Sequence, residues 1–116
     1  MKQWLKVMVV GGKSERDAGT LRSALALLDP KEVISFGHYP CEKAAIRWAR
    51  QNIHVKPIEI TFEEGEPSVI EYATAVKSIR PDIVIGFRRG TDLEREVVGL
   101  SKMVSVIVLQ REVAKS

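Results

Sequence analysis

Short apolar runs alternate with stretches of helical periodicity along the whole sequence, and few folds satisfy such an alternation. The runs expected as strands are residues 6–10, 32–36, 55–60, 82–85 and 104–109. The stretches expected as helices are residues 17–28, 41–51, a segment opened by Pro67, and 92–102. Strands that alternate with helices of this length predict a parallel sheet with helices on both faces. We therefore expect an α/β fold: a single Rossmann-like, three-layer domain with a five-stranded, mostly parallel sheet.

The third expected helix carries two local signals. Pro67 is expected at its first position, because proline lacks an N–H group that the first turn would leave unbonded. Its apolar residues recur at helical spacing and are expected to face the sheet: Val69, Ile70, Ala73 and Val76. The domain is expected to span residues 1–116, with a polar tail at 110–116.

Composition excludes several classes of protein. The chain has 116 residues, of which 45% are hydrophobic and 28% charged, as in soluble globular domains. Its apolar runs are too short for a transmembrane helix, and the N-terminal segment lacks an apolar signal region, so a cytoplasmic location is expected. A single cysteine, Cys41, excludes an internal disulfide and a multi-cysteine zinc site. We expect no metal and no cofactor.

Charge is distributed unevenly along the chain. The formal net charge is +3, yet residues 57–76 contain five glutamates and neither lysine nor arginine. The rest of the chain is therefore strongly basic. This asymmetry favours an anionic ligand with a locally polar or ribose-like part. Solubility alone would explain it equally well, and both interpretations stay open.

Three of the expected strands end in glycine or are followed by glycine and polar residues. Ligands of open α/β sheets bind beyond the carboxyl ends of the strands. Glycine lets a backbone approach a ligand closely, and the N–H groups at the start of the next helix attract anions. The candidate ligand-binding residues are Gly11, Gly12, Lys13, Ser14, Arg16, Gly37, His38, Tyr39, Arg88, Arg89, Gly90 and Thr91.

The first of these loops matches neither common phosphate-binding motif. Its sequence Gly-Gly-Lys-Ser lacks the spacing of a P-loop, and no GxGxxG dinucleotide fingerprint is present. Lys13 and Arg16 are nevertheless placed to neutralise a phosphate. The alternative is a tight turn between strand and helix with solvated charges.

The fourth loop carries the strongest cationic signal. Arg88 and Arg89 precede an expected helix, where two guanidinium groups can fork onto phosphate or carboxylate oxygens. Thr91 is expected to donate its hydroxyl to the ligand or to cap the helix. Glu94, one turn further, is a candidate acceptor for a ribose hydroxyl. A glutamate favourable to the helix dipole is the alternative for Glu94.

The second loop offers aromatic and imidazole chemistry. Tyr39 is a candidate to stack on a base, and His38 to donate to a phosphate or transfer a proton. Cys41 opens the next helix, where a thiolate would be favoured, but a buried or inert role is expected. Glu42 and Lys43 follow it and are expected to face either the crevice or the solvent.

Three short motifs resemble one known family. They are Val9-Val10-Gly11-Gly12-Lys13, the segment from Phe36 to Arg50 with its acidic-x-x-Ala-x-x-Trp-Ala helix, and Gly90-Thr91-x-x-Glu94. On these motifs, residues 7–109 resemble the YspA-like family of the SLOG superfamily, which includes the DprA and LOG proteins. Phe87 and Arg88 replace the paired glycines of the LOG pattern. The resemblance implies nucleotide binding, assembly into a homo-oligomer and, in some members, hydrolysis of the N-glycosidic bond of a nucleoside monophosphate.

Three functions follow as hypotheses. The first is a sensor or sequestering protein that binds a nucleotide or a nucleotide-derived, possibly cyclic, signalling molecule. The second is a phosphoribohydrolase-like enzyme, with Glu94 as the catalytic carboxylate and Arg88 or Arg89 on the phosphate. The third is DprA-like binding of single-stranded nucleic acid. The modest net charge and the few aromatic residues disfavour the third.

Overall fold

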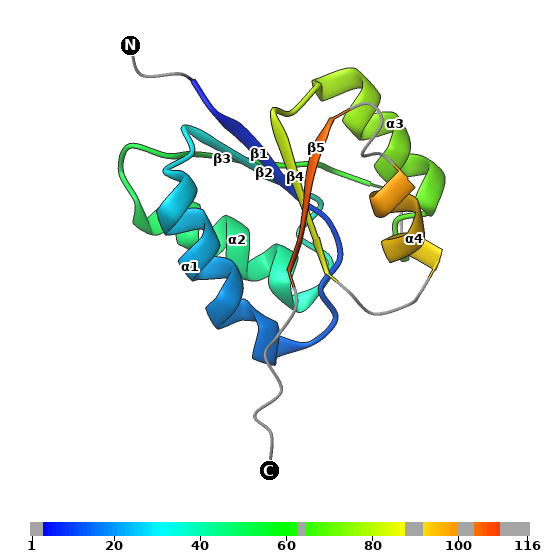
Figure 1. The fold of residues 1–116 in the computed structure, drawn as a ribbon, viewed down its shortest axis with the longest axis horizontal. Helices are drawn as coiled ribbons and strands as arrows, with labels where there is room; N and C mark the ends of the chain where they lie inside the picture. Colours follow the sequence, from blue (N-terminus) through cyan, green and yellow to red (C-terminus); the bar gives the residue numbers. More distant parts are fainter. Residues whose placement is uncertain (1–3, 63–64, 88–91, 100–103, 110–116) are drawn as a thin grey trace.

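The computed structural model describes residues 4–62, 65–87, 92–99 and 104–109, and these form an α/β sandwich around one sheet (Figure 1). The strands are β1 (Lys6–Val9), β2 (Glu32–Ser35), β3 (Lys56–Glu59), β4 (Ile83–Phe87) and β5 (Ser105–Leu109). The helices are the 3-10 helix η1 (Glu15–Asp17), α1 (Ala18–Leu28), α2 (Pro40–Gln51), α3 (Val69–Ile79) and α4 (Asp92–Gly99). The strand order is β3-β2-β1-β4-β5 and every pairing is parallel. The expected fold class is confirmed, and the sheet is wholly parallel.

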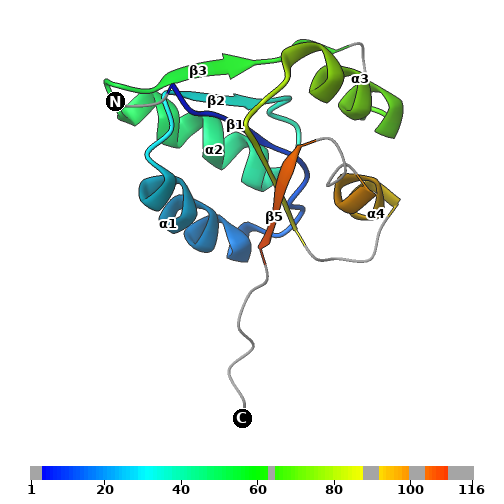
Figure 2. The same cartoon turned by 45° about the horizontal axis from the view of Figure 1, so that its top comes forward.

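The helices form two layers that enclose the sheet. Helices α1 and α2 cover one face, and α3 and α4 cover the other (Figure 2). The alternation of side chains along β1 matches this arrangement: Val7 and Val9 pack with the α1–α2 side, and Met8 and Val10 with the α3–α4 side. A strand buried on both faces needs the continuous apolar run seen in the sequence.

Helix α3 begins later than the sequence suggested. Ser68 is its N-cap: the Ser68 hydroxyl accepts from the Glu71 backbone at 3.1 Å, and a Glu71 carboxylate oxygen accepts from the Ser68 backbone at 3.3 Å. This reciprocal capping box fixes the start of the helix. The expectation that Pro67 occupies the first helical position is therefore wrong, since Pro67 precedes the cap.

The buried stripe of α3 also differs from the expected one. Ile70 is 76% exposed, whereas Tyr72 is 1% and Val76 3% exposed. The prediction that Ile70 faces the sheet is wrong because the larger Tyr72 ring takes the core-facing position. Tyr72 packs against Phe36, with ring centroids 4.5 Å apart.

Strand β4 continues beyond its expected end at Ile85. Gly86 and Phe87 pair with Val108 and Leu109 of β5, so Gly86 lies inside the strand. A Cβ atom at Gly86 would lie 2.7 Å from Cγ1 of Val97, so glycine here permits the close approach of α4. The other strand and helix ends that were predicted and that the structure describes agree with expectation or differ from it by one residue; the expected continuation of α4 to residue 102 lies outside the described residues.

Candidate functional site

The loops that follow β1 and β2 lie against each other at the carboxyl edge of the sheet. The backbone N–H of Cys41 donates to the carbonyl of Gly12 at 3.0 Å, and its thiol donates to the carbonyl of Ser14 at 3.2 Å. The start of α2 therefore rests on the first glycine loop. The structure thus brings together two of the three segments that the sequence singled out. Cys41 is buried, as expected.

The buried carboxylate of Glu42 fastens these loops together. Its Oε2 accepts from the backbone N–H of Gly11 at 2.9 Å and from the Tyr72 hydroxyl at 2.7 Å. Its Oε1 accepts from the backbone N–H groups of His38 and Tyr39 at 3.0 and 3.1 Å. Glu42 has no solvent exposure. The expectation that it faces the crevice or the solvent is wrong, because four donors from three segments surround it.

Burial dominates the electrostatics of this carboxylate. Desolvation raises the pKa of Glu42, and the bonds from Gly11 and Tyr72 partly oppose that rise because they favour the charged form. Burial, together with the adjacent Glu42 charge, also raises the pKa of Tyr72. In the described part of the chain, no cation pairs with Glu42. Glu42 therefore acts as an enclosed structural centre and not as a group that reaches a ligand.

The paired glycines of the first loop adopt left-handed backbone conformations. Gly11 has φ 82° and Gly12 has φ 87°. A Cβ atom at Gly12 would overlap with Cys41 and would lie 2.8 Å from the ring of Phe87. Gly12 is thus required by the contact of the loop with α2 and β4. Among the described residues, none accepts a hydrogen bond from the backbone N–H of Gly12 or Lys13.

Lys13 lies where the two loops meet. Its side chain is exposed, and its Nζ lies 5.5 Å from the centroid of the Tyr39 ring, within the range of a cation–π contact. Arg16 is also exposed. The hydroxyl of Ser14 accepts from the Arg16 backbone at 3.3 Å and so caps η1. Two cations of the expected set therefore flank one short loop.

Tyr39 is more enclosed than a free stacking platform would be. It is 8% exposed, its hydroxyl is hydrogen-bonded to Glu66, and the His38 ring lies edge-on to it at 4.7 Å. His38 is half-buried and also approaches Phe62, at 5.7 Å. A base that stacked on Tyr39 would have to displace Lys13 from its ring.

Two groups of candidates lie outside the described residues. Arg88, Arg89, Gly90 and Thr91 are not described, and neither is the side chain of Glu94, although its helix α4 is. Phe87, the last residue of β4, packs beside Gly12. The fourth loop therefore departs from a point next to the first loop.

The sequence did not reveal the roles of Glu42, Tyr72, Phe62 and Glu66. One signal existed: Glu42 stands three residues after Tyr39, with Pro40 between, which is the spacing of a capping box. Glu66 belongs to the acidic segment 57–76, so part of that segment reaches this edge of the sheet. Nothing in the local sequence pointed to Tyr72 as a partner of Glu42.

The described ranges hold neither a metal-binding cluster nor a helix suited to a membrane. Across the ranges that the structure describes, no three His, Cys, Asp or Glu side chains are grouped to hold a metal ion. No helix within those ranges has both the length and the apolar character to cross a membrane.

The fold of this chain is classified by its sheet topology. No family model, no curated protein and no solved structure matches this chain. The parallel five-stranded sheet with order β3-β2-β1-β4-β5 is Rossmann-like in topology.

Proposed function

We propose that this protein binds a nucleotide or nucleotide-derived signalling molecule at the carboxyl edge of its sheet, as a sensor or sequestering protein. The observation that carries the proposal is the junction of the two glycine loops, where Glu42 joins Gly11 to His38 and Tyr39 and where Lys13 projects to the surface. The proposed ligand contacts begin at this junction.

The position of the junction supports the proposal. The chain builds β1, β2 and β3 outward in one direction and then crosses to β4 on the other side of β1. In doubly wound sheets, ligands bind where the strand order reverses in this way. The first loop leaves β1 at that point, and Gly12 touches Phe87 at the end of β4.

Charge and backbone geometry favour a phosphate. In the described part of the molecule, no carboxylate pairs with Lys13 or Arg16. Lys13 is exposed, and among the described residues none accepts a hydrogen bond from its backbone N–H, whereas Gly12 is buried. Ammonium and guanidinium groups beside backbone donors form a common type of phosphate site. Arg88 and Arg89 would extend it from the fourth loop.

Aromatic and acidic groups of the second loop and of the segment between β3 and α3 favour a nucleoside part. The half-buried rings of His38 and Phe62 lie close together beside Tyr39, whose hydroxyl bonds to Glu66. Membership of the YspA-like SLOG family, and completion of the site by a second copy of the chain, belong to this proposal. Binding of single-stranded nucleic acid is the less favoured hypothesis.

In the described part of this junction, the carboxylate open to the enzymatic hypothesis is Glu66, which is exposed but already accepts from the Tyr39 hydroxyl. Glu42 is enclosed by its four donors and cannot approach the sugar of a bound nucleotide. Hydrolysis of an N-glycosidic bond would therefore need Glu94, or the release of Glu66 from Tyr39. We accordingly propose binding without turnover.

Calorimetry with adenosine and guanosine monophosphates and their cyclic forms tests the proposal. We expect saturable, stoichiometric binding of at least one nucleotide, and at least tenfold weaker binding by Lys13→Met. Lys56→Met, which removes an exposed cation from the amino end of β3, is the matched control and should bind normally. No saturable binding of any of these nucleotides, or equal losses in both variants, would overturn the proposal. Chromatographic detection of free base would establish the enzymatic alternative.

A further inference from the structure

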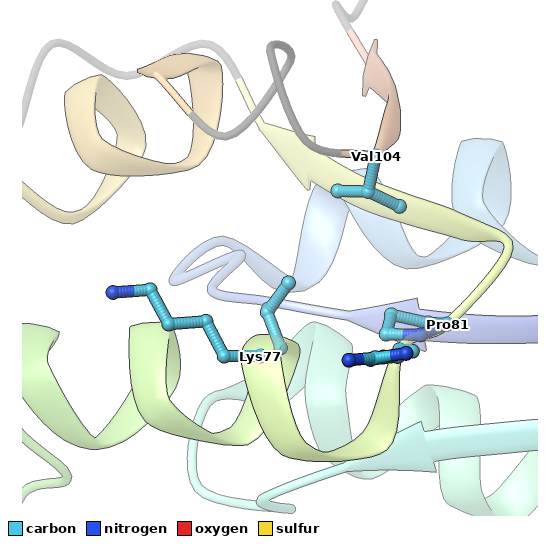
Figure 3. Close-up of a pocket in the computed structure, with 5 residues that line it drawn as sticks. Lys77, Pro81 and Val104 are labelled. Atoms are coloured by element: carbon cyan, nitrogen blue, oxygen red, sulfur yellow. The ribbon is translucent and has the colours of Figure 1, made fainter.

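A cavity of about 350 Å³ opens at the amino-terminal edge of the sheet, opposite the glycine loops (Figure 3). It lies between the last turn of α3 and the starts of β4 and β5. Its lining residues are Val76, Lys77, Arg80, Pro81 and Val104. Because the strands are parallel, this edge is separated from the proposed nucleotide site by the length of the sheet.

Three of the five described residues that line the cavity are apolar. Val76 and Pro81 are buried, and Val104 is half-buried. Figure 3 shows Val104 projecting from the start of β5 toward α3, with Pro81 below it. Apolar walls of this kind hold the hydrocarbon part of a ligand, while a few polar groups orient it.

The rim of the cavity is positively charged. Lys77 and Arg80 are both exposed, and within the described ranges neither is paired with a carboxylate. The carboxyl end of a helix such as α3 carries roughly half a negative elementary charge. Two full positive charges exceed that amount, so the rim retains a net attraction for an anion.

We propose that this cavity binds a small organic anion that carries an apolar ring or short chain. Its volume lies at the lower end of the range of small-molecule sites, which is about 300–1,000 Å³. That size suits a single- or double-ring acid and not a dinucleotide or a long lipid. The anionic group contacts Lys77 and Arg80, and the apolar part packs on Val76, Pro81 and Val104.

The direct test is a nuclear magnetic resonance titration of the isotopically labelled full chain with naphthalene-2-sulfonate. We expect saturable shifts concentrated in the last turn of α3 and at the start of β5. Methanesulfonate, which has the charge without the rings, and 2-naphthol, which has the rings without the charge, should bind at least tenfold more weakly. Equal affinity for either of these probes, or shifts spread over unrelated surfaces, would overturn the proposal.

Paired variants separate this site from general charge attraction. Lys77→Met keeps an unbranched stem, and Arg80→Asn suits the left-handed backbone at that position, where φ is 55°. Together they should weaken naphthalene-2-sulfonate binding at least tenfold. The control, Arg22→Gln with Lys56→Met, removes the same charge from α1 and β3 and should leave binding unchanged. Unchanged binding in the first pair, or an equal loss in the control, would overturn the proposal. Lys77 and Arg80 would then serve only to stabilise the carboxyl end of α3.

Discussion

The hydroxyl of Tyr72 donates to Oε2 of Glu42 over 2.7 Å, and this bond joins helices on opposite faces of the sheet. Glu42 belongs to α2 and Tyr72 to α3. Their contact passes beyond the carboxyl ends of the strands, where no strand separates the two layers. The same carboxylate also holds the loops that follow β1 and β2. One buried side chain therefore fixes the relative position of both helical layers and of the candidate site.

Tyr72→Phe should weaken the bond to Glu42 without creating a cavity in the core. The variant keeps the ring that packs on Phe36 and removes only the donor. Loss of a hydrogen bond to a charged acceptor is expected to lower the free energy of unfolding by about 1.5–3 kcal/mol, measured by urea denaturation. The pKa of Glu42 should rise further, because the Tyr72 bond lowers it. An unchanged Glu42 pKa in a carbon-detected pH titration would contradict the assigned contact.

Glu42 should make the stability of the protein depend on pH. Burial raises the pKa of Glu42 above its ordinary value of 4.5. The native state therefore holds this proton more tightly than the unfolded chain does. The Glu42 contribution to the free energy of unfolding is expected to fall as pH rises from 4.5 through the native pKa, and to be constant above it.

Glu42→Gln isolates that contribution, because glutamine does not titrate. The difference in unfolding free energy, wild type minus variant, should decrease across this pH window in urea denaturation experiments. Other titrating groups are common to both proteins and cancel in the difference. A difference that stays constant or grows with pH would show that burial does not control the ionisation of Glu42.

Two glycine-to-alanine substitutions should have opposite effects. Gly12→Ala introduces a Cβ into a left-handed backbone and against Cys41 and Phe87, so it should lower stability by at least about 2 kcal/mol. Gly19→Ala, in α1, meets nothing within 4 Å and should raise stability by about 0.5–1 kcal/mol. Thermal or urea unfolding measures both. Similar changes in the two variants would mean that the packing around Gly12 is looser than described.

The left-handed residues that end α1 and α3 offer a further comparison. Arg80 has φ 55° and Asp29 has φ 49°. Arg80→Gly should stabilise the protein by about 0.5–1 kcal/mol, because glycine adopts this conformation without steric cost. Asp29→Gly should gain less, since aspartate tolerates the left-handed region better than arginine does. A larger gain at Asp29 would contradict this explanation.

The layered fold followed from the sequence because its cause is local. A run such as residues 6–10 must be covered on both faces, and helices of matching length supply the cover. Element ends depended on distant partners instead. Gly86 belongs to β4 because it pairs with Val108 of β5. That partner is distant in the sequence, so the residues around Gly86 do not indicate the pairing. The start of α3 is set by a local signal, the capping box of Ser68 and Glu71. The sequence pattern favoured the neighbouring Pro67 instead, because proline is a common first residue of helices.

The location of the candidate site could be predicted from the sequence, but the contacts that hold its residues could not. Parallel strands place their carboxyl ends together, so the meeting of the first two loops followed from fold class. Glu42 looked like an ordinary first-turn glutamate, because its partners Gly11 and Tyr72 lie 31 and 30 residues away. Tyr39 looked available for stacking, but Lys13 and Glu66 already engage it.

The bonds that Glu42 accepts have a consequence for how an anion is held. The backbone donors of Gly11, His38 and Tyr39 are consumed inside the protein, so the attraction would come chiefly from the exposed charges of Lys13 and Arg16. Dissolved ions screen such charges: the Debye length shrinks from about 30 Å at 0.01 M ionic strength to about 8 Å at 0.15 M. Ligand affinity should therefore decline steeply as salt is added, and comparisons between ligands are meaningful only at matched ionic strength.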